Sequence, residues 1–86
     1  MAVAIRMPPL GQNSDELEIV AWRKAEGEEV ARGELLLEVT TDKATLEVEA
    51  TTAGTLLRIV HHAGETVREG TVIAYVGAPG EEIPEP

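Results

Sequence analysis

Few residues in this 86-residue chain could take part in chemistry: it has two histidines, two lysines and no cysteine. Without cysteine there is no disulfide, no thiolate nucleophile and no cysteine-based metal site. His61 and His62 are adjacent, but no third ligand stands at a useful spacing, so we interpret them as solvated turn residues. The lysine amines are therefore the groups whose positions in the fold matter most.

Lys43 is predicted to lie at the tip of a β-hairpin. The stretches 35–39 and 46–50 alternate between apolar and polar residues with the period of two that strands require. If positions whose numbers sum to 85 pair, every inward residue meets another: Leu35 with Ala50, Leu37 with Val48, Val39 with Leu46 and Thr41 with Ala44. A slip of one residue would expose the whole apolar set, so Asp42 and Lys43 are left as the two tip residues.

A lysine breaks the usual chemistry of such a tip, because two-residue turns favour Asn-Gly, Asp-Gly or Gly-x. Positions where local preference and fold disagree tend to be functional. The alternative is a solvated lysine in an ordinary turn, but the only other lysine, Lys24, lies in a strand-to-turn region. The surroundings of the tip are acidic, with carboxylates at Glu38, Asp42, Glu47 and Glu49. We therefore predict that the amine of Lys43 is modified.

The elements that position this lysine are predicted to be strands. Short runs rich in Val, Ile, Leu and Thr recur between glycine-bearing stretches, at the spacing of an all-β sandwich or barrel. The runs are 3–5, 17–22, 35–39, 44–50, 55–60 and 71–76. The only aromatic residues are Trp22, interpreted as a packing anchor, and Tyr75, so the core must be aliphatic. A chain this short encloses a thin core without a walled catalytic cleft, which disfavours an independent enzyme.

An internal repeat supports this fold. An offset of 37 superimposes Gly27 on Gly64 and Gly33 on Gly70, and it aligns a shared Gly-Glu-x-Val-x-x-Gly pattern followed by an apolar run. The glycines are predicted to occupy turns with positive φ. We expect two short β units that pack about a pseudo-twofold axis into one flattened sandwich.

Charge and hydropathy restrict partners and location. The formal net charge is −9, a field that repels phosphate backbones and anionic lipid surfaces, so nucleic acid and membrane are excluded as partners. No apolar run is long enough for a spanning helix, and no signal peptide is evident. We expect a cytoplasmic or organelle-matrix setting. Residues 1–78 are predicted to form the domain, and the Pro- and Glu-rich residues 79–86 to begin an interdomain linker or a frayed tail.

Four segments of the chain resemble a known family. They are Met7-Pro8-x-Leu10-Gly11, Val20-x-Trp22-x-Lys24-x-x-Gly27, Thr41-Asp42-Lys43-Ala44 and Ala53-Gly54-Thr55. Together they resemble the lipoyl domain of 2-oxoacid dehydrogenase complexes over residues 3–78, nearly the whole chain. The resemblance implies two four-stranded antiparallel sheets, with lipoate in amide linkage on Lys43 between the flanking turn residues Asp42 and Ala44. Family members often have glutamate at the position of Thr40.

The resemblance also implies a function and a set of partners. The domain would be a monomeric, non-enzymatic carrier within a dihydrolipoamide acyltransferase, loaded by a lipoyl ligase. Its swinging arm would serve a thiamine-diphosphate-dependent dehydrogenase, the acyltransferase core and dihydrolipoamide dehydrogenase in turn. In relatives the loop that corresponds to residues 10–16 lies beside the lipoyl lysine and helps the dehydrogenase to recognise it.

Three other classes of protein are considered. A biotin carrier shares the duplicated sandwich, but the methionines expected on both sides of its lysine are replaced by Asp42 and Ala44. A glycine-cleavage carrier also bears lipoate and usually has additional helices. An unmodified β interaction module would show no added mass after exposure to a lipoyl ligase. Pyruvate, 2-oxoglutarate and branched-chain complexes share these motifs, so the sequence leaves the 2-oxoacid open.

Overall fold

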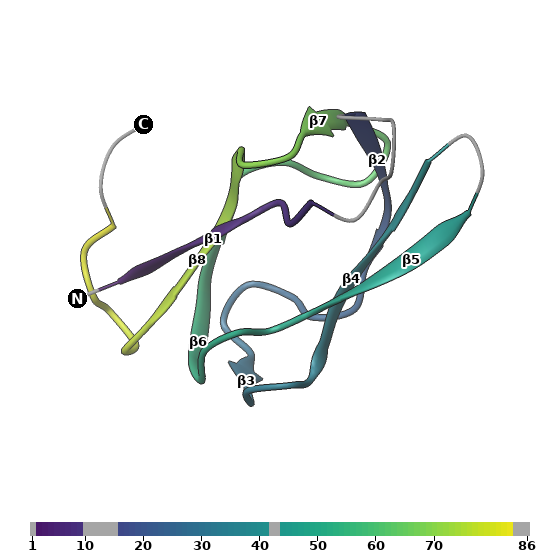
Figure 1. Ribbon diagram of the computed structural model, residues 1–86. Helices are drawn as coiled ribbons and strands as arrows, with labels where there is room; N and C mark the ends of the chain where they lie inside the picture. Colours follow the sequence, from purple (N-terminus) through teal and green to yellow (C-terminus); the bar gives the residue numbers. More distant parts are fainter. Residues whose placement is uncertain (1, 10–15, 42–43, 84–86) are drawn as a thin grey trace.

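The strands of this protein form two antiparallel sheets. The computed structural model describes residues 2–9, 16–41 and 44–83, which contain eight strands and no helix. Each sheet has four strands, and the sheets face each other across a common core (Figure 1). The predicted all-β fold of two four-stranded antiparallel sheets is therefore confirmed. Nothing in the described part of the chain is a helix long and apolar enough to span a membrane.

The first sheet, sheet A, has the strand order β1-β8-β6-β3. Its strands are β1 (Val3–Arg6), β8 (Val72–Gly77), β6 (Gly54–Ile59) and β3 (Glu29–Val30). The second sheet, sheet B, has the order β5-β4-β2-β7. Its strands are β5 (Thr45–Glu49), β4 (Leu35–Thr40), β2 (Glu16–Trp22) and β7 (Thr66–Arg68). Periodicity did not reveal β3 and β7, because strands of two and three residues are too short to show alternation.

The core between the sheets is aliphatic, as the composition predicts. Its largest fully buried side chains are Met7, Leu17, Ile19, Leu36, Leu37, Val39, Leu56, Ile73 and Val76. Trp22 packs against this core at its edge, and its indole N–H donates to the carbonyl oxygen of His61 at 2.9 Å. Trp22 is thus the packing anchor that the sequence predicts.

The internal repeat is present in three dimensions. Gly27 and Gly64 have φ of 93° and 94°, and Gly33 and Gly70 both have φ of 87°. The hydrogen bonds at these turns also repeat: the amide of Gly27 donates to Leu56 O at 2.7 Å, and the amide of Gly64 to Ile19 O at 2.8 Å. Ile19 and Leu56 are themselves related by the offset of 37. Each bond therefore crosses from one half of the chain to the other.

The two halves interlock, and neither half is a unit that packs as a separate body. Sheet B combines β2 and β4 from the first half with β5 and β7 from the second, and sheet A combines β6 and β8 with β1 and β3. The turn at Gly27 carries the chain from β2 in one sheet to β3 in the other. As a result, neither half can form a complete sheet without the other.

The predicted hairpin register is confirmed near its tip and wrong at its base. Leu37 pairs with Val48 and Val39 with Leu46, as predicted. Leu35, however, pairs with Glu49, not with Ala50, because the register shifts between Leu35 and Leu37. Such a bulge adds one residue to a strand and breaks the alternation of side chains, and the neighbours Leu36 and Leu37 are accordingly both fully buried.

Candidate functional site

The hairpin of β4 and β5 is held together at its end by threonine hydroxyls. The amide of Thr41 donates to Ala44 O at 2.9 Å, which closes the strand pair. The hydroxyl of Thr40 lies 3.0 Å from Thr41 O and 3.1 Å from Ala44 O, and the amide of Ala44 donates to Thr41 Oγ1 at 3.2 Å. Thr45 Oγ1 lies 3.5 Å from Thr40 Oγ1. We call Thr40, Thr41 and Thr45 the threonine cluster.

The predicted attachment residue falls beside this cluster in the sequence. Asp42 and Lys43 lie outside the described residues, as does the part of the predicted recognition loop at 10–15. Ala44 is described and exposed, and both its amide and its carbonyl bond to Thr41. Sequence reasoning did not predict the threonine cluster. The sequence does contain a signal for the cluster, which is the presence of three threonines around the predicted turn. Threonine hydroxyls commonly bond to the backbone of nearby turn residues.

The second lysine, Lys24, is held in an ion pair. Its Nζ lies 2.8 Å from Glu34 Oε2, and the side chain is only 19% exposed. The bond to Glu34 raises the pKa of Lys24, and the bonds from Lys24 and from the amide of Ala31 lower the pKa of Glu34. The neutral form of an amine is the one that attacks an acyl group. Lys24 is therefore mostly covered and held in an ion pair, and both features disfavour it as a site of acylation.

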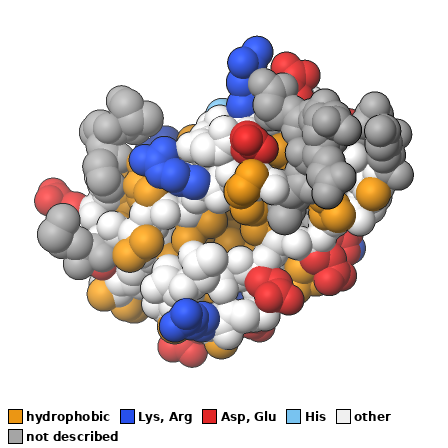
Figure 2. Space-filling view, viewed as in Figure 1, with side chains coloured by type: hydrophobic (Ala, Val, Ile, Leu, Met, Phe, Trp, Pro, Cys, Tyr) orange, Lys and Arg blue, Asp and Glu red, His pale blue; other side chains and the backbone are white. Residues whose placement is uncertain are grey.

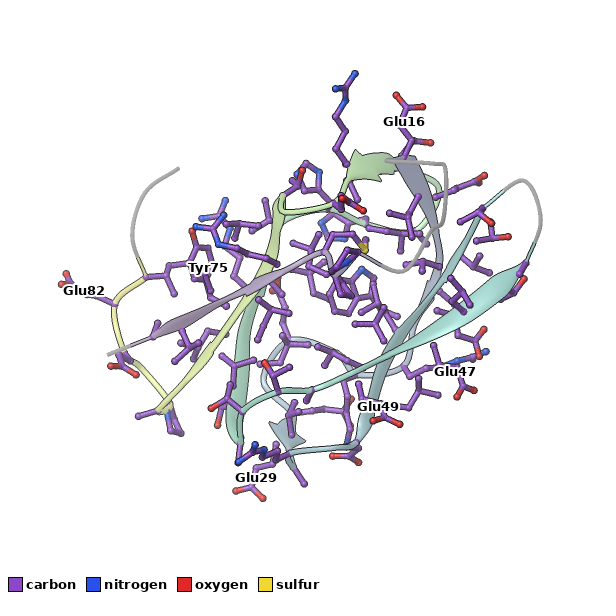
Figure 3. The ribbon with its side chains drawn as sticks, viewed as in Figure 1. Glu16, Glu29, Glu47, Glu49, Tyr75 and Glu82 are labelled. Atoms are coloured by element: carbon purple, nitrogen blue, oxygen red, sulfur yellow. The ribbon has the colours of Figure 1, made fainter. Side chains whose placement is uncertain are left out.

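The carboxylates that the sequence predicts around the tip are neutralised to different degrees. Glu38 in β4 stands directly opposite Glu47 in β5, a destabilising arrangement of like charges. Arg23 relieves it, since its guanidinium donates to Glu38 at 2.9 Å. Glu47 and Glu49 project outward from β5 (Figure 3), and acidic side chains gather along that side of the molecule (Figure 2).

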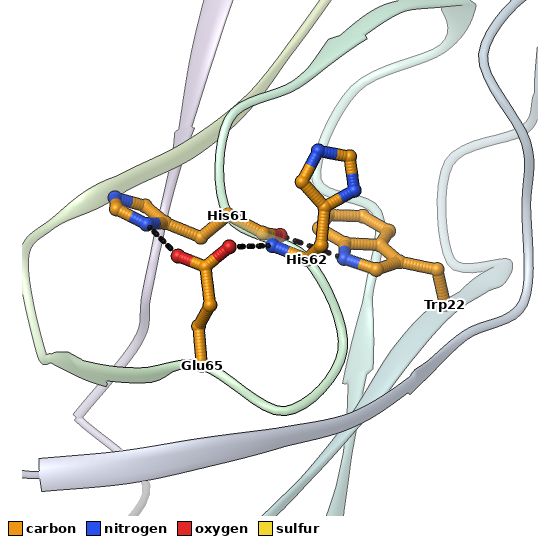
Figure 4. A network of polar contacts seen from close by, with 4 residues as sticks. All are labelled: Trp22, His61, His62 and Glu65. Atoms are coloured by element: carbon orange, nitrogen blue, oxygen red, sulfur yellow. Dashed lines mark hydrogen bonds and ion pairs between the residues drawn. The ribbon is translucent and has the colours of Figure 1, made fainter.

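The histidines belong to a turn that Glu65 organises (Figure 4). The amide of His62 donates to Glu65 Oε2 at 2.9 Å, and His61 Nδ1 lies 2.8 Å from Glu65 Oε1. The bond from the amide of His62, and then that from His61, lower the pKa of Glu65. His62 is exposed, as predicted, whereas His61 is partly buried and engaged. The bonds of Trp22 to His61 O and of Glu65 to both histidines hold this turn together. The described residues contain no cluster of three potential metal ligands.

Comparison with known proteins identifies the family. Residues 3–76 match the biotin/lipoyl family, described as "Biotin-requiring enzyme". The chain is 40% identical over 84 residues to the dihydrolipoyllysine-residue acetyltransferase component of the pyruvate dehydrogenase complex of Rhizobium meliloti, covering 96% of this chain and 19% of the relative. It is 38% identical over 85 residues to the corresponding component of the acetoin cleaving system of Bacillus subtilis, covering 99% and 21%.

A solved structure narrows the assignment from the biotin/lipoyl family to a lipoyl domain. The lipoyl domain of the 2-oxoglutarate dehydrogenase complex from Azotobacter vinelandii superimposes with a TM-score of 0.70 at 31% identity, and the match covers 86% of this chain and 94% of that domain. The chain belongs to the biotin/lipoyl family and is a lipoyl domain, a small carrier module. It spans about a fifth of the length of the two curated relatives.

Proposed function

We propose that Lys43 carries lipoate and that the domain works as the swinging arm of a 2-oxoacid dehydrogenase complex, within a dihydrolipoamide acyltransferase chain. The observation that carries the proposal is the contrast between the two lysines. Lys24 is tied to Glu34 at 2.8 Å. Lys43 follows the strand end that the threonine cluster secures.

The residues of this chain supply presentation. Bound lipoate would supply a dithiolane that accepts acyl groups and electrons, and amide formation would remove the charge of the lysine. In this proposal the arm would start between β4 and β5, and the hydrogen bonds at the end of these strands would restrict the motion of its base. Tethering of the domain within the complex would make each encounter with an enzyme of the complex effectively intramolecular.

The partners and the setting follow from the same proposal. They are a lipoyl ligase, a thiamine-diphosphate-dependent 2-oxoacid dehydrogenase, an acyltransferase core and dihydrolipoamide dehydrogenase, in a bacterial cytoplasm or an organelle matrix. The relatives serve pyruvate dehydrogenase, acetoin-cleaving and 2-oxoglutarate dehydrogenase systems. The likeness therefore supports the class of complex and leaves its 2-oxoacid open.

Mass spectrometry tests the attachment. Wild-type protein, Lys43→Arg and Lys24→Arg would each be produced with a lipoyl ligase and lipoate. We expect one lipoyl group on wild type and on Lys24→Arg, and none on Lys43→Arg. Modification that persists in Lys43→Arg, or a peptide map that places the group on Lys24, contradicts the proposal.

The same experiment decides between lipoate and biotin, since the family description names biotin. The proteins would be incubated in parallel with a biotin ligase and biotin. We expect no biotin on any of them. Biotin on wild type, together with no lipoate, would assign the domain to biotin carriers instead.

A further inference from the structure

The outer face of sheet B carries an exposed valine on a strand bulge. Val20 is 44% exposed, and the pairing of β2 with β4 shifts register between Ile19 and Ala21. Among the described residues, the only other large exposed hydrophobic side chain is Val3 in β1, at 46%. An isolated exposed valine needs no explanation, but the internal repeat provides a comparison for Val20.

The equivalent position in sheet A is covered by the protein itself. The offset of 37 relates Val20 to Leu57, and the register of β6 and β8 shifts around Leu57 as that of β2 and β4 does around Val20. Leu57 is partly buried: its Cδ1 lies close over Gly77, and it shares a surface hollow with Pro79 and Gly80. Its neighbour Thr55, equivalent to the exposed Glu18, is only 8% exposed.

The topology explains why only one of the two bulges is covered. After β4 the chain passes through Thr41 and Ala44 into β5, which occupies the edge beside β4. After β8 the corresponding edge is occupied by β1. The following residues therefore turn back, with the amide of Glu81 donating to Ala78 O at 3.0 Å (Figure 1). Among the described residues, those that follow β4 enter β5, and none corresponds to the segment 78–81 that lies beside the bulge in sheet A.

The surroundings of Val20 define what could cover it. Glu18 precedes it on the same face of β2, and Glu38, which is paired with Arg23, stands opposite Ala21. Farther across the sheet, Glu47 stands opposite Glu38. A complementary surface would carry lysine or arginine around a small aliphatic or proline side chain, comparable in size to the residues that cover Leu57.

The position of Val20 indicates which partner would meet it. Glu18 pairs with Thr40, at the end of β4 that leads to Lys43 in the sequence. An enzyme that receives an arm attached there approaches this end of sheet B. We propose that Val20 docks into a basic surface of the 2-oxoacid dehydrogenase, a surface with a small apolar side chain at its centre. This inference rests on the proposed carrier function.

The chain offers a matched pair of variants for the test. Val20→Thr and Val3→Thr each replace a valine of nearly equal exposure by a polar side chain of similar shape, one in each sheet. Both variants and wild type would be lipoylated and checked by intact mass and thermal unfolding. Initial rates of reductive acylation would then be measured against domain concentration, with thiamine-diphosphate-dependent dehydrogenases specific for pyruvate and for 2-oxoglutarate.

We expect Val20→Thr to raise the KM for the domain by roughly 3- to 10-fold, the effect of losing one partly buried apolar contact, with kcat unchanged. Val3→Thr should match wild type. The KM of wild type should rise with ionic strength, while the ratio of the two KM values stays constant, because salt screens charges and not apolar contacts.

Several outcomes overturn the docking proposal. They are an unchanged KM for Val20→Thr, an equal effect of Val3→Thr, and a KM ratio that disappears at high salt. A slower lipoyl ligase reaction with a normal dehydrogenase KM would assign the face to the ligase instead. If neither these two dehydrogenases nor a branched-chain 2-oxoacid dehydrogenase acylates lipoylated wild type, the carrier proposal itself fails, and that result is distinct from a failure confined to Val20→Thr.

Discussion

At the scale of single residues, backbone conformation and local partners decide what each side chain can do. Lys24 has nearly the same chemistry as any other lysine, yet the carboxylate of Glu34, 2.8 Å away, keeps it charged and partly covered. Gly27 and Gly64 lie in the left-handed region that side chains with a Cβ avoid. Both effects are local, and both are testable by single substitutions.

Valine at either turn glycine should destabilise the domain through backbone strain. A Cβ at Gly27 or at Gly64 would meet no atom within 4 Å, so the added Cβ itself makes no clash. With φ of 93° and 94°, Gly27→Val and Gly64→Val should each lower the free energy of unfolding by ~1–3 kcal/mol, and by similar amounts. Urea titration measures this. Ala25→Val in the same turn is the control, expected within ~0.5 kcal/mol, and a neutral effect at either glycine would contradict the strain argument.

At the scale of elements, side-chain hydrogen bonds hold the hairpin and the turns that the strands alone would leave loose. The threonine cluster does this at the end of β4 and β5. Glu65 does it for the turn before β7, where it accepts one bond from a backbone amide and contacts one imidazole. Each device predicts a measurable loss on substitution.

Thr41→Val should loosen the hairpin end. The substitution keeps the shape of the side chain and removes the oxygen that accepts from the amide of Ala44. We expect a loss of ~0.5–1.5 kcal/mol in the free energy of unfolding, and a lipoylation rate lowered several-fold, because the ligase meets a less fixed lysine. Thr66→Val, in β7 at the opposite edge of sheet B, is the control. Equal lipoylation rates of Thr41→Val and the control would show that the hydroxyl does not position the lysine.

Glu65 should make stability depend on pH on the acid side. Its pKa is lowered in the folded state, so its contribution is present above the unfolded pKa and is lost as pH falls through the folded pKa. The melting temperatures of wild type and Glu65→Gln should therefore differ above about pH 5, and the difference should shrink as the pH falls below that value. Thermal unfolding across that range is the measurement. A difference that stays constant with pH would exclude the charge of Glu65 as its cause.

At the scale of the whole molecule, the net charge is −9, and individual carboxylates differ in how far a neighbouring cation neutralises them. The field steers basic partners and repels acidic ones. Glu38 is neutralised by Arg23, whereas Glu47, opposite Glu38, and Glu49, opposite Leu35 at the base of the hairpin, face solvent along β5. The latter two are therefore the better candidates for guiding a dehydrogenase to the arm.

Replacing both exposed carboxylates should slow the encounter with the dehydrogenase. In the double variant Glu47→Gln and Glu49→Gln, we expect a lower kcat/KM for reductive acylation and a weaker dependence of kcat/KM on salt. Glu38→Gln should have a smaller effect, since its charge is already paired. Free lipoamide measured alongside should react far less efficiently than the domain. Equal efficiency of free lipoamide would rule out recognition of the protein surface.

The sequence by itself determined the features that depend on neighbours along the chain. A period of two aligns apolar side chains on one face, so the register from Leu37 to Thr40 could be worked out without coordinates. The repeated glycines predicted both turns, because only glycine adopts positive φ at little cost. The position of Lys43 between two strands follows from the same pairing, in which the numbers of paired positions sum to 85.

The tertiary structure decided whatever depends on residues that folding brings together. The bond from Trp22 to His61 joins positions 39 apart, and that from Arg23 to Glu38 joins positions 15 apart. No local pattern contains the ion pair of Lys24 with Glu34, the interlocking of the two halves, or the partial burial of Leu57 that Val20 lacks. Side-chain periodicity fixes which face a residue takes, but its partner on that face is set by the path of the whole chain.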